Sequence, residues 1–226
     1  LGCGFYLSYN RIPEFPGKAV DFKSWRLSDA PAVGERIIFN WHNFLSSCST
    51  WDLAEWEAWI RQAARMRYSG VMVHAYGNNP MTCFTHNEQI KPVGWLSTTY
   101  SGRDWGTEHV NDIRRLYGGD FFEGPVFGSS SAMVPDDGRV SSVKELMSRA
   151  FACAREYGLD VVFALDVDTE AANPQNIIKT LPWSAQIKVG GSIVANPDTP
   201  QGYDYYRAQV ASLLADYPQI SRLVLW

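Results

Sequence analysis

Short apolar runs alternate with longer amphipathic segments along most of the chain. Three continuous apolar runs, at residues 36–40, 71–73 and 159–165, have the length and composition of strands that are buried on both faces. A further strand is predicted at 221–226, and the short segment 192–195 is another candidate.

The strongest helix prediction lies between the first two of these strands. Apolar residues recur at helical spacing over 51–68, Ser49 or Thr50 can cap the first turn, and Gly70 can cap the end.

A second long helix is predicted before the third apolar run. Ser141 or Ser142 is its expected N-cap and Gly158 ends it, while Asp136 to Gly138 are interpreted as a turn. Shorter helices are predicted at 108–117, 174–180 and 203–217.

The alternation of strands and helices predicts an α/β fold with a parallel sheet, either doubly wound or a (β/α)8 TIM barrel. The barrel is favoured because no glycine-rich phosphate motif follows a strand, and polar and aromatic residues gather where strands end. With four or five strands, residues 31–226 are expected to be the first half of a barrel that continues beyond Trp226. Residues 1–30, extended at 2–7 and then rich in proline and glycine, are expected to end a preceding small α/β domain and form a linker.

Composition narrows the classes of partner. Lys and Arg number 20 and Asp and Glu 24, so the formal net charge of −4 leaves no basic surface for nucleic acid. No apolar run reaches the roughly 18 residues of a spanning helix, so no membrane partner is expected. The 9 Trp, 11 Tyr and 11 Phe exceed what cores usually need, and such rings stack on sugars or line pockets. A carbohydrate partner is therefore favoured, and a homo-oligomer is left open.

The cysteines indicate neither a zinc site nor a redox motif. Cys3, Cys48, Cys83 and Cys153 include no C-x-x-C pair, so they are interpreted as separate thiols and the redox compartment is left open. The chain shows no signal peptide, begins without methionine and stops after an apolar run, so both ends look cut. The location is unknown, with a secreted or periplasmic one favoured.

Candidate functional residues follow the ends of three predicted strands. These residues are Asn40 and His42 at the end of the first strand, His74, Tyr76 and Asn78 at the end of the second, and Asp166 and Asp168 at the end of the third. Strand ends of a barrel converge on one mouth, so the side chains are expected to share a pocket. Amides and carboxylates bind pairs of hydroxyl groups and aromatic rings cover apolar sugar faces, which suits a polyhydroxylated ligand.

Each candidate also has a purely structural interpretation. Asn40 can satisfy a loop backbone, and His42 or His74 can be a hydrogen-bonded core histidine. One of Asp166 and Asp168 can cap the next helix, and the two share a face only if the strand runs through both. Asp166 is the slightly favoured candidate for chemistry.

Other kinds of active site find little support. The histidines that could build a metal site with these aspartates are His42, His74, His86 and His109. No H-x-H or H-E-x-x-H motif is present, and G-x-S-x-G is also absent, so no metal and no cofactor are predicted. Glycoside hydrolysis needs two carboxylates, and Asp166, Asp168 and Glu123 are the candidates that this chain offers.

Several segments, in order, resemble the alpha-N-acetylglucosaminidases together with the related alpha-glucuronidases. The last strand and exit of the domain before the barrel are matched by Leu1 to Pro13. The first barrel strand and its helix are matched by Ile37 to His42, Thr50 to Asp52, Trp56-Glu57 and Met66 to Gly70. A loop after the second strand is matched by Phe121 to Phe127, and the approach to the acid-bearing strand by Ala195 to Asp198 with residues 205–226.

The resemblance implies an exo-acting glycosidase whose general-acid glutamate lies beyond Trp226. It places Asn40 and His42 among sugar-binding residues and Tyr76 at an aromatic position, while Glu123 stands where the family usually has a small polar residue. His42, like the string from His74 to Tyr76, departs from the family. Histidine can carry positive charge near neutral pH, so these departures can favour a uronic acid.

The predicted function is a glycoside hydrolase that removes a terminal sugar, a uronic acid or an N-acetylhexosamine, by carboxylate acid/base chemistry. Two alternatives stay open: a metal-dependent barrel hydrolase of the deacetylase type, and a non-catalytic carbohydrate-binding protein on the same scaffold. Half a barrel leaves strand edges unpaired, so residues 1–226 alone are expected to aggregate or stay molten.

Overall fold

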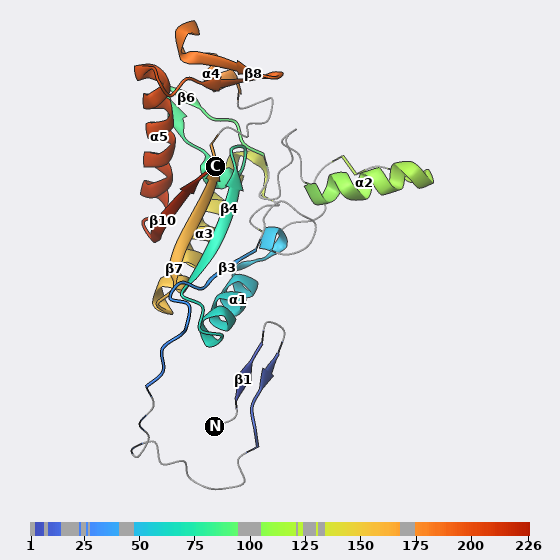
Figure 1. Cartoon of the computed structure of the whole chain (residues 1–226). Helices are drawn as coiled ribbons and strands as arrows, with labels where there is room; N and C mark the ends of the chain where they lie inside the picture. The colour runs from blue at the N-terminus through green and yellow to red at the C-terminus, as the bar shows by residue number, and fades with distance from the viewer. Residues whose placement is uncertain are drawn as a thin grey trace.

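A four-stranded parallel sheet forms the centre of the protein in a computed structural model (Figure 1). The structure describes residues 3–6, 9–14, 23, 26, 28–40, 48–94, 105–120, 122–123, 130, 134–167 and 175–226. The sheet has the order β10-β7-β4-β3, formed by β3 (Ile37–Phe39), β4 (Gly70–Tyr76), β7 (Asp160–Asp166) and β10 (Ile220–Leu225). All four strands were predicted, and the α/β class and parallel pairing are confirmed. The described residues form no closed barrel.

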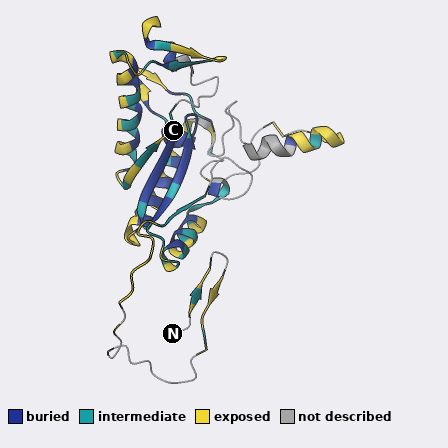
Figure 2. Ribbon diagram, in the orientation of Figure 1, coloured by how far each residue is buried: buried dark blue, intermediate teal, exposed yellow. Residues whose placement is uncertain are grey.

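Helices cover one face of this sheet. The helices are α1 (Leu53–Arg65), α3 (Asp136–Glu156) and α5 (Pro200–Asp216). One apolar core joins all three helices to the odd-numbered residues of β4 and β7, such as Val73 and Phe163. Figure 2 shows the central strands as buried and the outward sides of the helices as exposed. Even-numbered residues of β4 and β7 lie on the opposite face, because successive side chains alternate.

Helix α1 confirms the strongest helix prediction, but its ends differ from the expected ones. Asp52 is the N-cap, and a capping box joins Asp52 to Glu55, whose carboxylate accepts the Asp52 amide at 3.0 Å. The helix ends at Arg65, and Arg67 takes the left-handed conformation with φ of 63°. Gly70 instead begins β4, where a Cβ would lie 3.0 Å from the Asp160 carbonyl oxygen, so its small size serves strand packing.

Helix α3 starts earlier than predicted. It begins at Asp136, so the expected caps Ser141 and Ser142 lie inside it and the expected turn is its first turn. Acidic groups in a first turn are favoured by the helix dipole, which explains how this segment stays helical despite Gly138. The predicted end is confirmed, because Gly158 follows with φ of 73°.

Residues between β7 and α5 form a small layer of their own. Segment 192–195 is a strand as predicted, β9 (Ser192–Ala195), but it pairs antiparallel with β8 (Gln186–Val189) outside the central sheet. The short helix α4 (Gln175–Ile178) and the 3-10 turn η4 (Trp183–Ala185) precede this hairpin. A second apolar cluster, which includes Phe84 and Tyr205, joins this layer to α5.

Short hairpins and one further helix complete the described elements. The predicted extended start is the hairpin of β1 (Gly4–Phe5) and β2 (Asn10–Arg11). A 3-10 turn, η2 (Cys48–Thr50), precedes α1. After β4 come another 3-10 turn, η3 (Pro80–Thr82), and the hairpin of β5 (Thr85–His86) and β6 (Gln89–Ile90). Helix α2 (Trp105–Tyr117) follows. The four cysteines are free thiols. Among the described helices, none is long and apolar enough to cross a membrane.

Candidate functional site

The carboxyl ends of the four parallel strands lie along one edge of the sheet. Asn40 directly follows β3, His74 and Tyr76 lie near the end of β4, Asp166 ends β7, and Trp226 directly follows β10. We call His74, Tyr76, Asp166 and Trp226 the strand-end group. The carboxyl edge of a parallel sheet is where ligand sites are found in α/β proteins.

The strand register brings this group onto one face. Tyr76 is paired with Asp166 and His74 with Ala164, so these side chains point to the same side of the sheet. That side is opposite to the face covered by α1, α3 and α5. Two of the residues predicted from separate strand ends, Tyr76 and Asp166, are therefore neighbours across one ladder.

His74 is buried at the centre of the strand-end group. Its side chain has no exposed surface, and its Nε2 lies 3.7 Å from Oδ2 of Asp166, whose side chain is 19% exposed. Burial lowers the pKa of His74, and the neighbouring Asp166 carboxylate opposes that shift. The imidazole is therefore neutral at neutral pH, so His74 supplies no positive charge of the kind expected for a uronic acid.

Aromatic rings pack around this imidazole. The Tyr76 ring meets it edge-on with centroids 4.6 Å apart, and the Trp226 ring lies 4.9 Å away with a tilt of 30°. The ladder between β10 and β7 places Trp226 opposite Asp166 at the sheet edge. Trp226 was not among the predicted site residues, although it is the last residue of a predicted strand just as Asn40 is, and that position is the signal that would have found it.

The other predicted site residues are Asn40, Asn78, Glu123, His42 and Asp168. Asn78 is 2% exposed, and its backbone carbonyl accepts the Gly94 amide at 2.8 Å. Asn40 is half-buried, and its carbonyl oxygen accepts the Cys48 thiol at 3.5 Å. Glu123 follows α2 and is exposed, and within the described residues no recorded contact joins it to the strand-end group. His42 and Asp168 lie outside the described residues.

A second histidine–carboxylate pair lies in another part of the molecule. Nε2 of His86 is 3.4 Å from Oδ2 of Asp204, which also binds Arg207, so this pair joins the β5–β6 hairpin to α5. In the part of the chain that the structure describes, no three side chains of the metal-binding types gather in one place.

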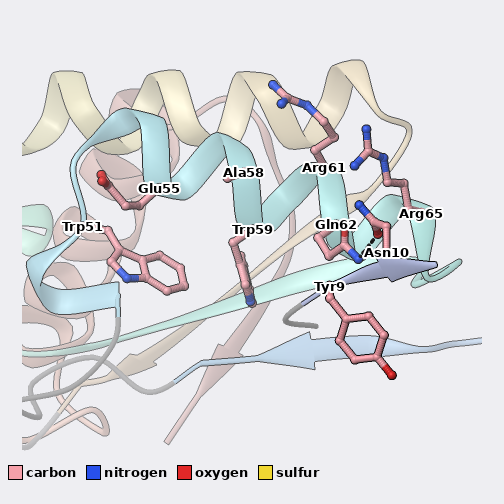
Figure 3. A pocket seen from close by; sticks show the side chains of 9 residues that line it. All are labelled: Tyr9, Asn10, Trp51, Glu55, Ala58, Trp59, Arg61, Gln62 and Arg65. Atoms are coloured by element: carbon pink, nitrogen blue, oxygen red, sulfur yellow. Dashed lines mark hydrogen bonds between the residues drawn. The ribbon is translucent and has the colours of Figure 1, made fainter. Parts of the chain in front are cut away.

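A separate hollow of about 440 Å³ lies between α1 and β2 (Figure 3). It is lined by Tyr9, Asn10, Trp51, Glu55, Ala58, Trp59, Arg61, Gln62 and Arg65. Trp51, just before α1, and Trp59, within it, contribute neighbouring rings to this hollow, with centroids 5.8 Å apart (Figure 3). Gln62 Nε2 donates to Oδ1 of Asn10 at 2.8 Å and to the Tyr6 carbonyl, which holds the β1–β2 hairpin against α1.

The strand-end group combines a carboxylate, a phenol and an indole around a neutral imidazole. A carboxylate and a phenol can accept hydrogen bonds from vicinal hydroxyl groups, and an indole face can cover C–H groups. The carboxylate can also carry or release a proton. Chemically, the group suits a ligand that has both hydroxyl groups and an apolar face.

No protein-family model matches this chain, and no curated protein matches it. Among solved structures it is similar to a GH138 enzyme targeting pectin rhamnogalacturonan II, with 12% identity and a TM-score of 0.48 over 89% of this chain and 20% of that one. It is also similar to two structures of StrH, the pneumococcal exo-beta-D-N-acetylglucosaminidase with tandem GH20 catalytic modules. The identities are 10% and 8%, and the TM-scores are 0.42 and 0.43. Each of these two covers 84% of this chain and 41% of the other chain. This chain thus spans from a fifth to about two fifths of the solved structures that it resembles.

Proposed function

We propose that residues 31–226 are the first half of a (β/α)8 barrel and that residues 1–30 end a preceding domain. The support is that all the helices joined to the main core lie on one face of the sheet, as in a barrel wall, whereas a doubly wound sheet has helices on both faces. β3 and β10 are the outermost strands of the described sheet and would be the strands that pair onward.

The hollow beside α1 supports the same proposal. Trp51 and Trp59 are partly buried against the main core and line this hollow, and in a closed barrel a further helix would pack beside α1. Hydrogen exchange on the full-length protein tests this proposal. If a strand pairs with the outer edge of β3, all amides of residues 37–39 exchange slowly, whereas rapid exchange of the outward-pointing amides contradicts the barrel.

The proposed function is removal of a terminal sugar, a uronic acid or an N-acetylhexosamine, from an oligosaccharide or glycoconjugate. One observation carries it: the partly exposed Asp166 carboxylate lies on the same edge and face as Tyr76 and the Trp226 indole. In this proposal Asp166 takes part in acid/base chemistry or stabilises positive charge at the sugar carbon, and Tyr76 binds hydroxyl groups.

The remaining predicted residues enter the proposal at the rim of the site. Asn40 and His42 would contact the sugar from the end of the first strand, and Asp168 would lie beyond Asp166. Asn78 and Glu123 are proposed as further substrate-binding residues. A second carboxylate, the general acid, is proposed to come from residues beyond Trp226.

A non-catalytic carbohydrate-binding protein is the second candidate. It is favoured by the fact that the described part of the strand-end group contains a single carboxylate, Asp166, whereas glycoside hydrolysis uses a pair. Such a protein would bind the same sugars through the same residues and release none.

One experiment separates these functions. The full-length protein is incubated with the p-nitrophenyl glycosides of N-acetylglucosamine, in both anomers, and of glucuronic acid. Release of nitrophenol by the wild type, lost by at least a hundredfold in Asp166→Asn and retained in Asp198→Asn, supports the glycosidase. Asp198 is a suitable control because it is an exposed aspartate outside the strand-end group. Binding without release indicates the binding protein, and neither binding nor release contradicts both.

A further inference from the structure

Both backbone groups of Trp226, its amide and its carbonyl, are hydrogen-bonded to β7 and the residue after it. Its amide donates to the Leu165 carbonyl at 3.0 Å, and its own carbonyl accepts the Val167 amide at 3.3 Å. These bonds continue the ladder in which Leu225 is paired with Leu165, so Trp226 comes opposite Asp166. Its side chain therefore falls on the same face as Asp166 and His74.

The indole rests on the buried imidazole. The two rings are tilted by only 30° with centroids 4.9 Å apart, and the Tyr76 ring meets the imidazole at 87°. One side of the indole is supported by His74. His74 itself has no exposed surface, so the imidazole is out of reach of a ligand.

We infer that Trp226 is the platform on which the sugar ring of the substrate stacks, and that His74 is a positioning residue that holds this indole from beneath. The inference rests on the proposed function and adds two roles to it. A sugar ring has an apolar C–H face and a rim of hydroxyl groups. The indole matches the face, and the adjacent carboxylate of Asp166 matches the rim.

The chemistry around the platform favours a sugar over other flat ligands. A wholly apolar ring would leave the Asp166 carboxylate beside it without a hydrogen-bond donor, which is unfavourable when the ligand excludes water. An anionic nucleotide would place its phosphates near that carboxylate in a chain with a net charge of −4. A ligand with hydroxyl donors and no dense negative charge fits both groups.

Kinetics of Trp226 variants test the platform with the nitrophenyl glycoside that the wild type cleaves. Trp226→Ala is expected to raise KM at least tenfold and leave kcat within about threefold, because a stacking contact is made equally in the bound substrate and the transition state. Trp226→Phe should restore most of the loss. Trp183→Ala is the matched control, since Trp183 is 84% exposed in η4, and it should change neither constant. An unchanged KM in Trp226→Ala overturns the platform.

Variants of His74 test its role beneath the indole. His74→Phe keeps a flat ring there and is expected to hold KM within about threefold, while His74→Ala should raise KM as Trp226→Ala does. If His74 bound the sugar through its nitrogens, both variants would lose affinity equally, and that result overturns the positioning role. Thermal melts of every variant separate a loss of folding from a loss of affinity.

A measurement without substrate separates this inference from the proposed function. In Trp226→Ala, water reaches His74, so the pKa of the imidazole should move up toward its ordinary value in an NMR titration. An unchanged pKa means that the indole does not cover His74 and overturns the arrangement, whatever the enzyme cleaves. If the wild type cleaves the glycoside and Trp226→Ala leaves KM unchanged, only the platform is contradicted. If the wild type neither binds nor cleaves any of the glycosides, the proposed function is contradicted and the platform with it.

Discussion

Oδ2 of Asp166 lies 3.7 Å from Nε2 of His74, yet the two side chains differ in their access to solvent. The imidazole is fully buried between Tyr76 and Trp226, whereas 19% of the aspartate side chain is exposed. Only the carboxylate can touch a ligand, while the imidazole can influence that ligand solely through its neighbours. Asp166 is therefore the member of this pair that a ligand can contact, and His74 is a buried residue that holds its neighbours in place.

Replacing Asp166 should lower the pKa of His74 further. Burial already disfavours the imidazolium, and the Asp166 carboxylate is the group that opposes this effect. In Asp166→Asn the opposing charge is gone, so NMR titration should place the His74 transition at lower pH than in the wild type. Asp204→Asn is the matched control, because Asp204 pairs with His86 instead. A His74 transition that moves upward in Asp166→Asn would show that the carboxylate does not stabilise the imidazolium.

Stability should fall in acid because of His74. Its pKa is lower in the folded state than in the unfolded chain, where histidine has a pKa of about 6.5. The unfolded state then binds more protons, so this contribution is complete above about pH 6.5 and is lost as the pH falls through the folded-state value. Each pKa unit of difference corresponds to about 1.4 kcal/mol. Urea unfolding at pH 7 and pH 5 should show a larger loss in the wild type than in His74→Phe, and equal losses would contradict the argument.

Continuous apolar runs made the sheet predictable, while local polar segments hid other elements. The strands β4 and β7 are buried, so each reads as an unbroken apolar run. β8 was missed because Gln186–Val189 is short, with exposed polar and apolar residues mixed along it. The start of α3 was missed because Asp136 to Gly138 has the composition of a turn, and only the dipole of the long helix that follows favours it as a first turn.

For the site, position along a strand was predictable and burial was not. Tyr76 and Asp166 were expected to share a pocket because both lie at strand ends, and the register makes them direct neighbours. Buried His74 is in contact with Trp226, which is 152 residues away in sequence and reaches it because β10 pairs with β7. No local pattern carries that contact, so His74 was interpreted as a ligand-contacting residue.

Gln62 should control how firmly the N-terminal hairpin is held. Its Nε2 donates to Oδ1 of Asn10 and to the Tyr6 carbonyl, the recorded hydrogen bonds that join the β1–β2 hairpin to α1. In Gln62→Ala, hydrogen exchange in residues 4–6 and 9–11 should become about fivefold faster, as expected for losing roughly 1 kcal/mol of hydrogen bonding. Arg65→Ala, on the rim of the same hollow, is the control and should leave this exchange unchanged. Equal exchange in Gln62→Ala and the wild type would mean that other contacts hold the hairpin.

Removing the hydroxyl of Tyr217 should stabilise the protein. The residue is fully buried, its ring stacks on Phe163 with centroids 6.3 Å apart, and within the described residues its hydroxyl has no hydrogen-bond partner. Burial raises the pKa of Tyr217 well above its ordinary value, so the group stays a neutral phenol. A buried polar group without a partner costs about 1–3 kcal/mol, and Tyr217→Phe removes that cost while keeping the ring.

Tyr206→Phe is the control with the opposite expected sign. The Tyr206 hydroxyl donates to the Ala195 carbonyl at 3.1 Å, so its removal loses a hydrogen bond worth about 1 kcal/mol. Denaturant unfolding should therefore shift the midpoint upward for Tyr217→Phe and downward for Tyr206→Phe, with unchanged m-values. A downward shift for Tyr217→Phe would contradict this prediction, because it would show that the hydroxyl has a hydrogen-bond partner in solution, such as a buried water next to Phe163.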